Sequence, residues 1–169
     1  MVVVRKESPQ DYEVVRRVNE LAFGQPNEAD LVDALRGVAQ PRLFLVAVTA
    51  GQVVGHIFFS PVVIESGDSD FTAVALAPMS VLPEYQRRGI GSELVNEGLI
   101  KRRQLGITVV VVIGHPDYYP RFGFTPAKER GLQCEYEVPD EAFMVLELTP
   151  GSLPGKGGFV KFPPEFTNV

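Results

Sequence analysis

The sequence predicts a single domain of the mixed α/β (α+β) class, spanning residues 1–169, with a central mixed sheet and helices on both of its faces. Its 169 residues, 45% of them hydrophobic, are enough for one substantial core. A strand, a glycine-containing turn, a helix and a second strand follow one another from 72 to 113, and this order favours parallel pairing of the two strands. Segments rich in Val, Ile and Phe precede them and indicate antiparallel strands.

The first 64 residues are expected to supply two helices and three strands. Ser8 is a suitable N-cap, with Pro9 in the first turn and Asp11 at capping-box spacing. The elements expected in order are a strand at 2–5, the helix that Ser8 caps, an amphipathic helix at 28–35, and a hairpin whose strands at 43–48 and 53–64 meet at Ala50-Gly51.

The rest of the chain continues the alternation and ends in an irregular extension. We expect a strand at 72–81, a helix at 90–105, a strand at 107–113, a short helix at 118–121, and strands near 125 and at 143–148. Residues 150–169 are rich in Gly and Pro but keep Phe159, Phe162 and Phe166. Because flexible tails seldom carry so many aromatic residues, this extension is expected to pack on the core (1–149) as a lid or an edge strand, with an exposed tail as the alternative.

The most informative segment is Gln86-Arg87-Arg88-Gly89-Ile90-Gly91, which separates a strand from a helix. The first turn of a helix has N–H groups without partners and the positive end of the helix dipole, and glycine lets a ligand approach the backbone. The segment therefore predicts an anion site, and a pyrophosphate suits it. The alternative is a tight turn beside a solvated pair of arginines. The P-loop and dinucleotide motifs do not fit, because no Gly-Lys-Ser/Thr follows and Leu94 stands at the place of the third glycine.

Two segments resemble motifs of the GNAT N-acetyltransferase superfamily. The run from Val81 through Pro83 to Gly91 is similar to its motif A, Gln/Arg-x-x-Gly-x-Gly/Ala after a strand. About thirty residues on, Tyr119-Pro120-Arg121-Phe122-Gly123-Phe124 is similar to its Tyr-x-x-x-Gly-Phe motif, again after a strand. The matching region covers about 72–127. The run from Gly114-His115-Pro116 to Phe124 also resembles one bacterial branch of the superfamily.

The resemblance implies an acetyl-CoA-dependent N-acetyltransferase with a splayed pair of parallel strands. Acetyl-CoA would be the acetyl donor, its arm lying along the strand before the loop, where the N–H of Val81 or Leu82 can polarise the thioester carbonyl. The residues expected to bind it are Val81, Leu82, Pro83, Arg87, Arg88, Gly89, Ile90, Gly91, Ser92, Glu93 and Leu94. No metal is expected.

The resemblance also makes Tyr119 the general acid toward the departing thiolate, because Tyr119 stands four residues before Gly123. The alternative is that Tyr118 and Tyr119 only wall the channel. His115 could bond the arm, relay a proton or cap the short helix. The family's usual glutamate base is missing from the interior of the strand at 71–80, so water or a remote group is expected to deprotonate the amine. Glu28 is a weak candidate for that base, and His56 is expected to be structural.

These expectations converge on direct attack of an amine on the thioester, without a covalent enzyme intermediate, since Cys134 lies outside both motifs. A non-catalytic acyl-CoA-binding regulatory module is the alternative, and it would need neither Tyr119 nor an open acceptor cleft. The acceptor, a small-molecule or a protein amine, is not encoded in any motif, and a homodimer is left open.

Composition bounds the partners and the compartment. The net charge of −5 and a pI near 5.1 argue against nucleic acid as the main partner. The charged Arg5-Lys6-Glu7 follows three valines, so no signal peptide is expected, and the longest apolar stretch is too short to span a bilayer. One cysteine suits a reducing cytosol, and a cytoplasmic location is expected.

Overall fold

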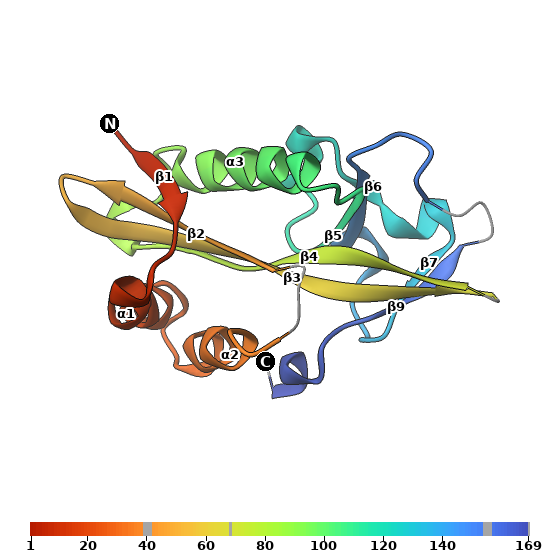
Figure 1. Ribbon diagram of the computed structural model, residues 1–169, viewed down its shortest axis with the longest axis horizontal. Coiled ribbons are helices and arrows are strands. Elements are labelled where there is room, and N and C mark those ends of the chain that lie inside the picture. The colour runs from red at the N-terminus through yellow and green to blue at the C-terminus, as the bar shows by residue number, and fades with distance from the viewer. Residues whose placement is uncertain (39–41, 68, 154–156, 169) are drawn as a thin grey trace.

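The structure, a computed structural model, describes residues 1–38, 42–67, 69–153 and 157–168. It has a nine-stranded mixed sheet with helices on both faces, as the sequence predicts. Helix α3 (Ile90–Gln104) covers one face, and α1 (Tyr12–Phe23) and α2 (Asn27–Leu35) lie against the other (Figure 1). None of the helices in the described part of the chain is long and apolar enough to cross a membrane.

The strands are mostly antiparallel, with one parallel pair at the centre. Their bounds are β1 (Val3–Lys6), β2 (Leu43–Thr49), β3 (Gln52–Ser66), β4 (Ser69–Val81), β5 (Val109–Ile113), β6 (Thr125–Pro126), β7 (Leu132–Cys134), β8 (Phe143–Glu147) and β9 (Gly158–Lys161). They follow the order β1-β2-β3-β4-β5-β8-β6, with β9 pairing both β3 and β7. The β4–β5 pair is parallel, as expected for strands joined through a helix.

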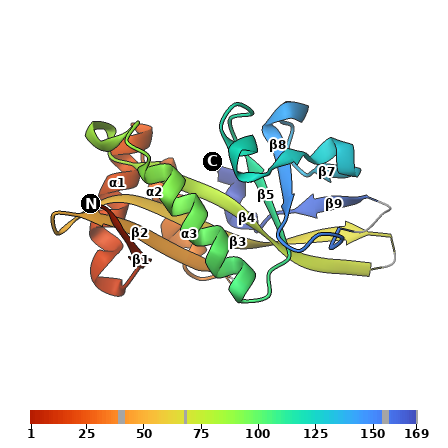
Figure 2. The same ribbon diagram turned by 90° about the horizontal axis from the view of Figure 1, so that it is seen from above.

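The long strands β3 and β4 run along the length of the molecule and connect its two ends (Figure 2). Seen from above, the three α-helices lie toward one end, and β5, β7, β8 and β9 lie toward the other (Figure 2). Helix α3 packs closely on the sheet because glycines open space for it. A Cβ at Gly98 would lie 2.2 Å from the Phe59 ring, and one at Gly55 would lie within 3.4 Å of Leu94 and Ile90.

The parallel pair β4–β5 separates toward the end of β4. The two strands pair only at Val74 with Val110 and at Ala75 with Val111. Beyond this point the β3–β4 register shifts between Ile57 and Phe59, so that β4 carries one extra residue there. Such a bulge bends a strand. The gap between the strands therefore opens beside the last residues of β4, where the sequence predicts the arm of a ligand.

The C-terminal extension packs on the core partly as a strand. Strand β9 pairs with the distal part of β3 and, in parallel, with β7, and Val160 and Phe162 are buried. The short 3-10 helix η6 (Pro164–Asn168) then lies near α2. Strand β7 is absent from the sequence predictions, because a strand of three residues carries too little alternation to be recognised, whereas β9 falls in the extension for which a lid or an edge strand is expected.

Candidate active site

The turn before α3 leaves its first N–H groups free to bind a ligand. Arg87 has φ 64° and Gly89 has φ 83°, so the backbone turns sharply before the helix begins at Ile90. An α-helix has no internal partner for the N–H groups of its first turn. The Glu93 N–H is the first to be used, donating to the Gly89 carbonyl at 3.0 Å. The N–H groups of Ile90, Gly91 and Ser92 are therefore the donors that the turn offers to an anion.

A cavity of about 320 Å³, here called the loop cavity, lies over this turn. Its walls come from both sequence motifs: Val81, Tyr85, Gln86, Arg87, Gly89, Ile90, Gly91, Ser92, Tyr118 and Arg121. The guanidinium of Arg121 lies 4.4 Å from the centroid of the Tyr118 ring, and its Nε donates to the Tyr118 carbonyl at 2.9 Å. Two positive side chains, Arg87 and Arg121, thus flank a turn that already favours anions.

Some of the expected ligand contacts lie away from the loop cavity. Leu94 is fully buried in the core, and its N–H belongs to the body of the helix, as does that of Glu93. The Arg88 guanidinium lies over the Tyr85 ring, 5.3 Å from its centroid, and Arg88 does not line the cavity. Pro83 has no N–H to donate and lines neither cavity. Leu94, Glu93, Arg88 and Pro83 thus lie outside the wall of the loop cavity, and their contacts with the donor stay predictions.

The strand register distinguishes Val81 from Leu82, the two residues expected to offer an N–H to the thioester carbonyl. The Leu82 N–H donates to the Val54 carbonyl at 2.8 Å, so it is occupied, and the Leu82 side chain is buried. Neighbouring residues of an antiparallel strand point their N–H groups to opposite edges. The Val81 N–H is therefore directed toward the side of β4 from which β5 has separated, whereas the Leu82 N–H is directed toward β3.

A larger cavity of about 710 Å³ adjoins the loop cavity, with which it shares the wall residues Val81 and Gln86. It is lined by the end of β4, by the residues that follow β5, and by side chains from α1, α2, the segment after β7 and the C-terminal extension. A ligand bound at the turn can thus reach past Val81 into a second chamber, which we call the large cavity.

Tyr118 and Tyr119 occupy different cavities although they are adjacent. The Tyr118 hydroxyl lies 2.9 Å from the Ser92 Oγ in the loop cavity. Tyr119 begins the 3-10 helix η3 (Tyr119–Phe122), lines the large cavity and is 7% exposed. Its ring lies over Gly114, where a Cβ would be 2.4 Å away. Burial raises the pKa of Tyr119 to about 12, so the hydroxyl stays protonated at neutral pH.

The other expected polar residues divide between the cavity and the core. His115 and Glu28 line the large cavity. The His115 carbonyl accepts the N–H of Tyr118 at 3.1 Å, so its backbone helps to cap the turn of η3. Gln25 donates to Glu28 at 3.0 Å. His56 lines neither cavity and is fully buried, in agreement with the structural role expected of it.

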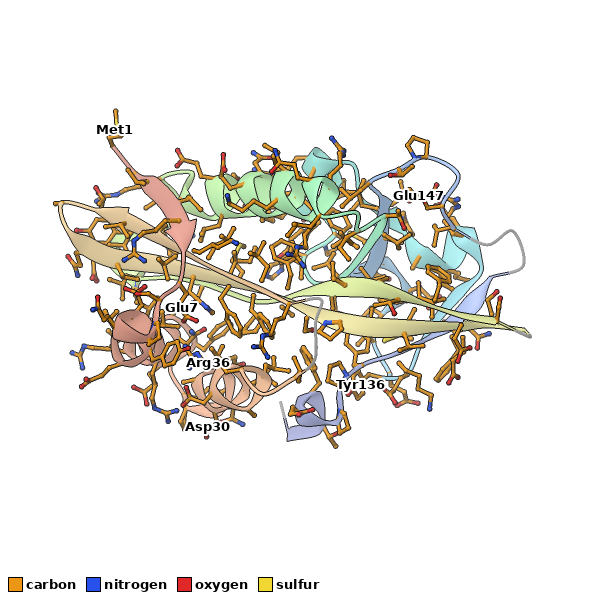
Figure 3. All side chains as sticks on the ribbon, in the orientation of Figure 1. Met1, Glu7, Asp30, Arg36, Tyr136 and Glu147 are labelled. Carbon is orange, nitrogen blue, oxygen red and sulfur yellow. The ribbon has the colours of Figure 1, made fainter. Side chains whose placement is uncertain are left out.

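His56 belongs to a buried polar cluster on the face of the sheet that α1 and α2 cover. An Arg36 nitrogen lies 2.7 Å from a Glu7 oxygen, and these two labelled side chains meet below the sheet in Figure 3. The His56 Nε2 lies 3.7 Å from the same Glu7 oxygen without a hydrogen bond. Burial, partly offset by Arg36, raises the pKa of Glu7. Burial, with Arg36 as a second cause, lowers the pKa of His56 to about 3.

Known proteins resemble this chain in both sequence and fold. The model of the acetyltransferase (GNAT) domain matches residues 3–127, well over half of the chain. The chain belongs to the GNAT acetyltransferase family. Two proteins of Escherichia coli K12, each named as an uncharacterised N-acetyltransferase, are similar to it. YjhQ is 40% identical over 80% of this chain and 78% of its own, and YhbS is 34% identical over 98% of each.

Solved structures of GNAT proteins share the fold over nearly the whole chain. The crystal structure of E. coli YhbS in complex with CoA superposes with a TM-score of 0.89 at 34% identity, covering 98% of this chain and 91% of that one. A GNAT acetyltransferase from Brucella melitensis in complex with acetyl-CoA gives a TM-score of 0.80 at 37% identity, with 98% of both chains covered. The family assignment and the predicted fold are thus confirmed.

Sequence reasoning missed several walls of this GNAT site. Gln86 lines both cavities, and its Nε2 donates to the Val81 carbonyl at 3.0 Å. Tyr136, Phe162 and Phe166 reach the large cavity from the last third of the chain. Gln86 and Arg121 lie inside the quoted motifs and could have been singled out there. The aromatic residues of the extension gave a signal for packing but none for the cavity.

Proposed function

We propose that this chain transfers the acetyl group of acetyl-CoA directly to an amine, without a covalent enzyme intermediate. The observation that carries the proposal is that the two cavities adjoin at Val81 and Gln86. Within the described residues, the first N–H groups of the turn have no backbone partner, the Val81 N–H faces away from β3, and the adjoining chamber is lined by a protonated Tyr119. Acetyl transfer from acetyl-CoA needs a site for the pyrophosphate, then a hydrogen-bond donor for the thioester carbonyl, and then a proton donor near the sulfur.

The donor half of the site fits a pyrophosphate followed by a narrow arm. The N–H groups of Ile90, Gly91 and Ser92 and the side chains of Arg87 and Arg121 would hold the pyrophosphate. The arm would lie in the gap between β4 and β5. The Val81 N–H would donate to the carbonyl oxygen, where negative charge develops as the amine attacks. The solved relatives bound to CoA and acetyl-CoA support this assignment.

Tyr119 would act on the leaving sulfur mainly by sharing its proton. With a pKa of about 12, its hydroxyl is a weaker acid than a thiol, whose pKa is about 8.5. Complete transfer would be uphill by roughly 5 kcal/mol, at about 1.4 kcal/mol for each pKa unit. The hydroxyl therefore stabilises the departing thiolate as a hydrogen-bond donor, while the proton that remains on sulfur comes from the nitrogen of the attacking amine. His115 is the second candidate for moving that proton, because it lines the same cavity.

Cys134 does not suit a covalent route. It lines neither cavity, and burial raises the pKa of its thiol, which lowers the fraction present as thiolate. A regulatory module that only binds an acyl-CoA would not need a large second chamber beside Tyr119. The identity of the amine and the expected cytoplasmic location belong to this proposal as well.

Two measurements on the purified protein test the proposal. Millimolar acetyl-CoA or CoA should raise the melting temperature, whereas free acetate should not, because only the nucleotide and arm reach the loop cavity. A panel of primary amines with acetyl-CoA should then give amine-dependent release of free thiol. A folded protein whose melting temperature is unchanged by either CoA compound would contradict the assignment of the donor site. Binding without release for any amine would favour the regulatory module.

A further inference from the structure

The far end of the large cavity has an aromatic and aliphatic wall that the donor does not require. Helices α1 and α2 contribute Phe23 and Leu31, the segment after β7 contributes Tyr136, and the C-terminal extension contributes Phe162 and Phe166. The ring centroids of Tyr136 and Phe162 lie 5.4 Å apart, and those of Phe162 and Phe166 lie 5.5 Å apart. Such a surface favours a ligand with an apolar body, because contact removes apolar area from water.

The charges that line this cavity have one sign. Of the described residues in its wall, the charged side chains are the carboxylates Glu28 and Glu137, and neither Lys nor Arg is among them. Glu28 comes from α2 and Glu137 from the segment after β7, so the negative potential is supplied from two different elements. An ammonium group is attracted into such a chamber, whereas a carboxylate would meet like charge and find no cation.

A buried hydrogen-bond acceptor lies beside the expected reaction centre. Ser80 is 4% exposed, lines the large cavity, and its Oγ has no hydrogen-bond partner within the described structure. A buried polar group without a partner costs free energy, so its natural partner is a ligand or a water molecule. Ser80 precedes Val81, whose N–H would hold the thioester carbonyl. A small displacement of this side chain would let its hydroxyl accept from an amine nitrogen next to that carbonyl.

We infer that the acceptor is a primary amine with an apolar, aromatic-sized body and no carboxylate group, of the arylalkylamine class. This inference rests on the proposed function and names the substrate class of the same site. The rings of Phe23, Phe162 and Phe166 would hold the body of the amine, and Glu28 and Glu137 would attract its ammonium form. Free amino acids would be rejected because their carboxylate would be desolvated in an acidic, apolar chamber.

The test compares two probes that differ by a carboxylate. Binding of 2-phenylethylamine and of phenylalanine to the CoA-saturated protein is measured by calorimetry, which does not depend on turnover. We expect the amine to bind at least tenfold more tightly. Equal binding of the two, tighter binding of phenylalanine, or no binding of either would overturn the inference. Thiol release from acetyl-CoA in the same samples tests the proposed reaction separately, so the two failures are distinguishable.

Variants connect the preference to the named side chains. Glu28→Gln and Glu137→Gln should each weaken binding of 2-phenylethylamine by about three- to tenfold and narrow its advantage over phenylalanine. Glu13→Gln is the matched control, because Glu13 is exposed on α1 and lines neither cavity. Unchanged affinity in both cavity variants, or an equal loss in the control, would contradict the role given to the two carboxylates. Phe166→Ala should also weaken binding of 2-phenylethylamine, whereas its affinity for CoA should equal that of the parent.

Discussion

The hydroxyl of Tyr118 lies 2.9 Å from the Oγ of Ser92, and this hydrogen bond joins two residues that directly flank the two sequence motifs in the wall of the loop cavity. Tyr118 comes from the turn after β5, whereas Ser92 is in the first turn of α3. The same hydroxyl would lie 3.4 Å from a Cβ at Gly91. Tyr118 therefore supports the expected pyrophosphate site, and the chemistry is left to Tyr119.

The first prediction is that Tyr118→Phe weakens CoA binding by about three- to tenfold and changes kcat by less than about threefold. A single hydrogen bond typically contributes about 0.5–1.5 kcal/mol, and 1.4 kcal/mol is a tenfold change in affinity. Calorimetry with CoA gives the affinity. Ser92→Ala is the matched variant, because it removes the other partner. The double variant should lose no more than either single variant, whereas additive losses would show that the two groups act independently.

The second prediction concerns the glycines of the turn. Gly91→Val places a branched side chain over the first turn of α3, and Gly89→Val additionally forces a β-branched residue to φ 83°. Each change should weaken acetyl-CoA binding more than tenfold, and Gly89→Val should also lower the melting temperature. Glu93→Leu is the control, because the Glu93 N–H is already bonded to the Gly89 carbonyl. Its affinity for acetyl-CoA should stay within about threefold of the parent's. Full affinity in a folded Gly91→Val variant would mean that the anion binds elsewhere.

Part of this site is readable from the sequence because it is local. The strand at 72–81, the Arg87–Gly91 turn and the following helix are specified by neighbouring residues, and the structure shows β4, the turn and α3 in that order. Strand β9 is different, because it is defined by pairing with β3 nearly a hundred residues earlier and with β7. No local pattern records such a partner.

The strand register is also needed to tell which N–H group at the end of β4 faces away from β3. From the sequence, Val81 and Leu82 were equivalent. Only the hydrogen bond from the Leu82 N–H to the Val54 carbonyl shows which of them faces β3. The wall of the large cavity is predicted only in part from the sequence, which makes Glu28 a candidate base at the site but does not mark Tyr136. Tyr136, Phe162 and Glu28 come from three distant segments, and the fold alone brings them to one cavity.

The third prediction is a pH dependence of stability that comes from His56. In the folded chain its pKa is about 3, lowered first by burial, whereas in the unfolded chain it has the ordinary value near 6.5. The unfolded state therefore binds more protons between these values. The contribution of His56 to the free energy of unfolding is fully present above the unfolded pKa. It is lost as the pH falls, by up to about 1.4 kcal/mol per pH unit. Glu7, whose pKa burial raises, contributes in the opposite direction as it takes up a proton.

Chemical denaturation between pH 7 and pH 5 measures this slope. The chain has two histidines, so each serves as the control for the other. His115→Gln, at an exposed position, should keep the parent's slope, whereas His56→Gln should flatten it whatever its effect on stability at neutral pH. The prediction would be contradicted if the pH dependence of stability were lost in His115→Gln and retained in His56→Gln.

The last prediction is that Tyr119→Phe lowers turnover much more than donor binding. The substitution keeps the ring that packs over Gly114 and removes only the hydroxyl in the large cavity. General acid assistance typically contributes about 10² to 10⁴ in rate. A hydroxyl with a pKa of about 12 shares its proton rather than giving it up, and water can partly replace it, so we expect a loss of about 10- to 100-fold in kcat. The affinity for CoA, measured by calorimetry, should change less than threefold. Tyr118→Phe must show the reverse pattern in the same assays. Equal turnover in Tyr119→Phe and the parent would make Tyr119 a wall of the cavity, and His115 would then be the group to test.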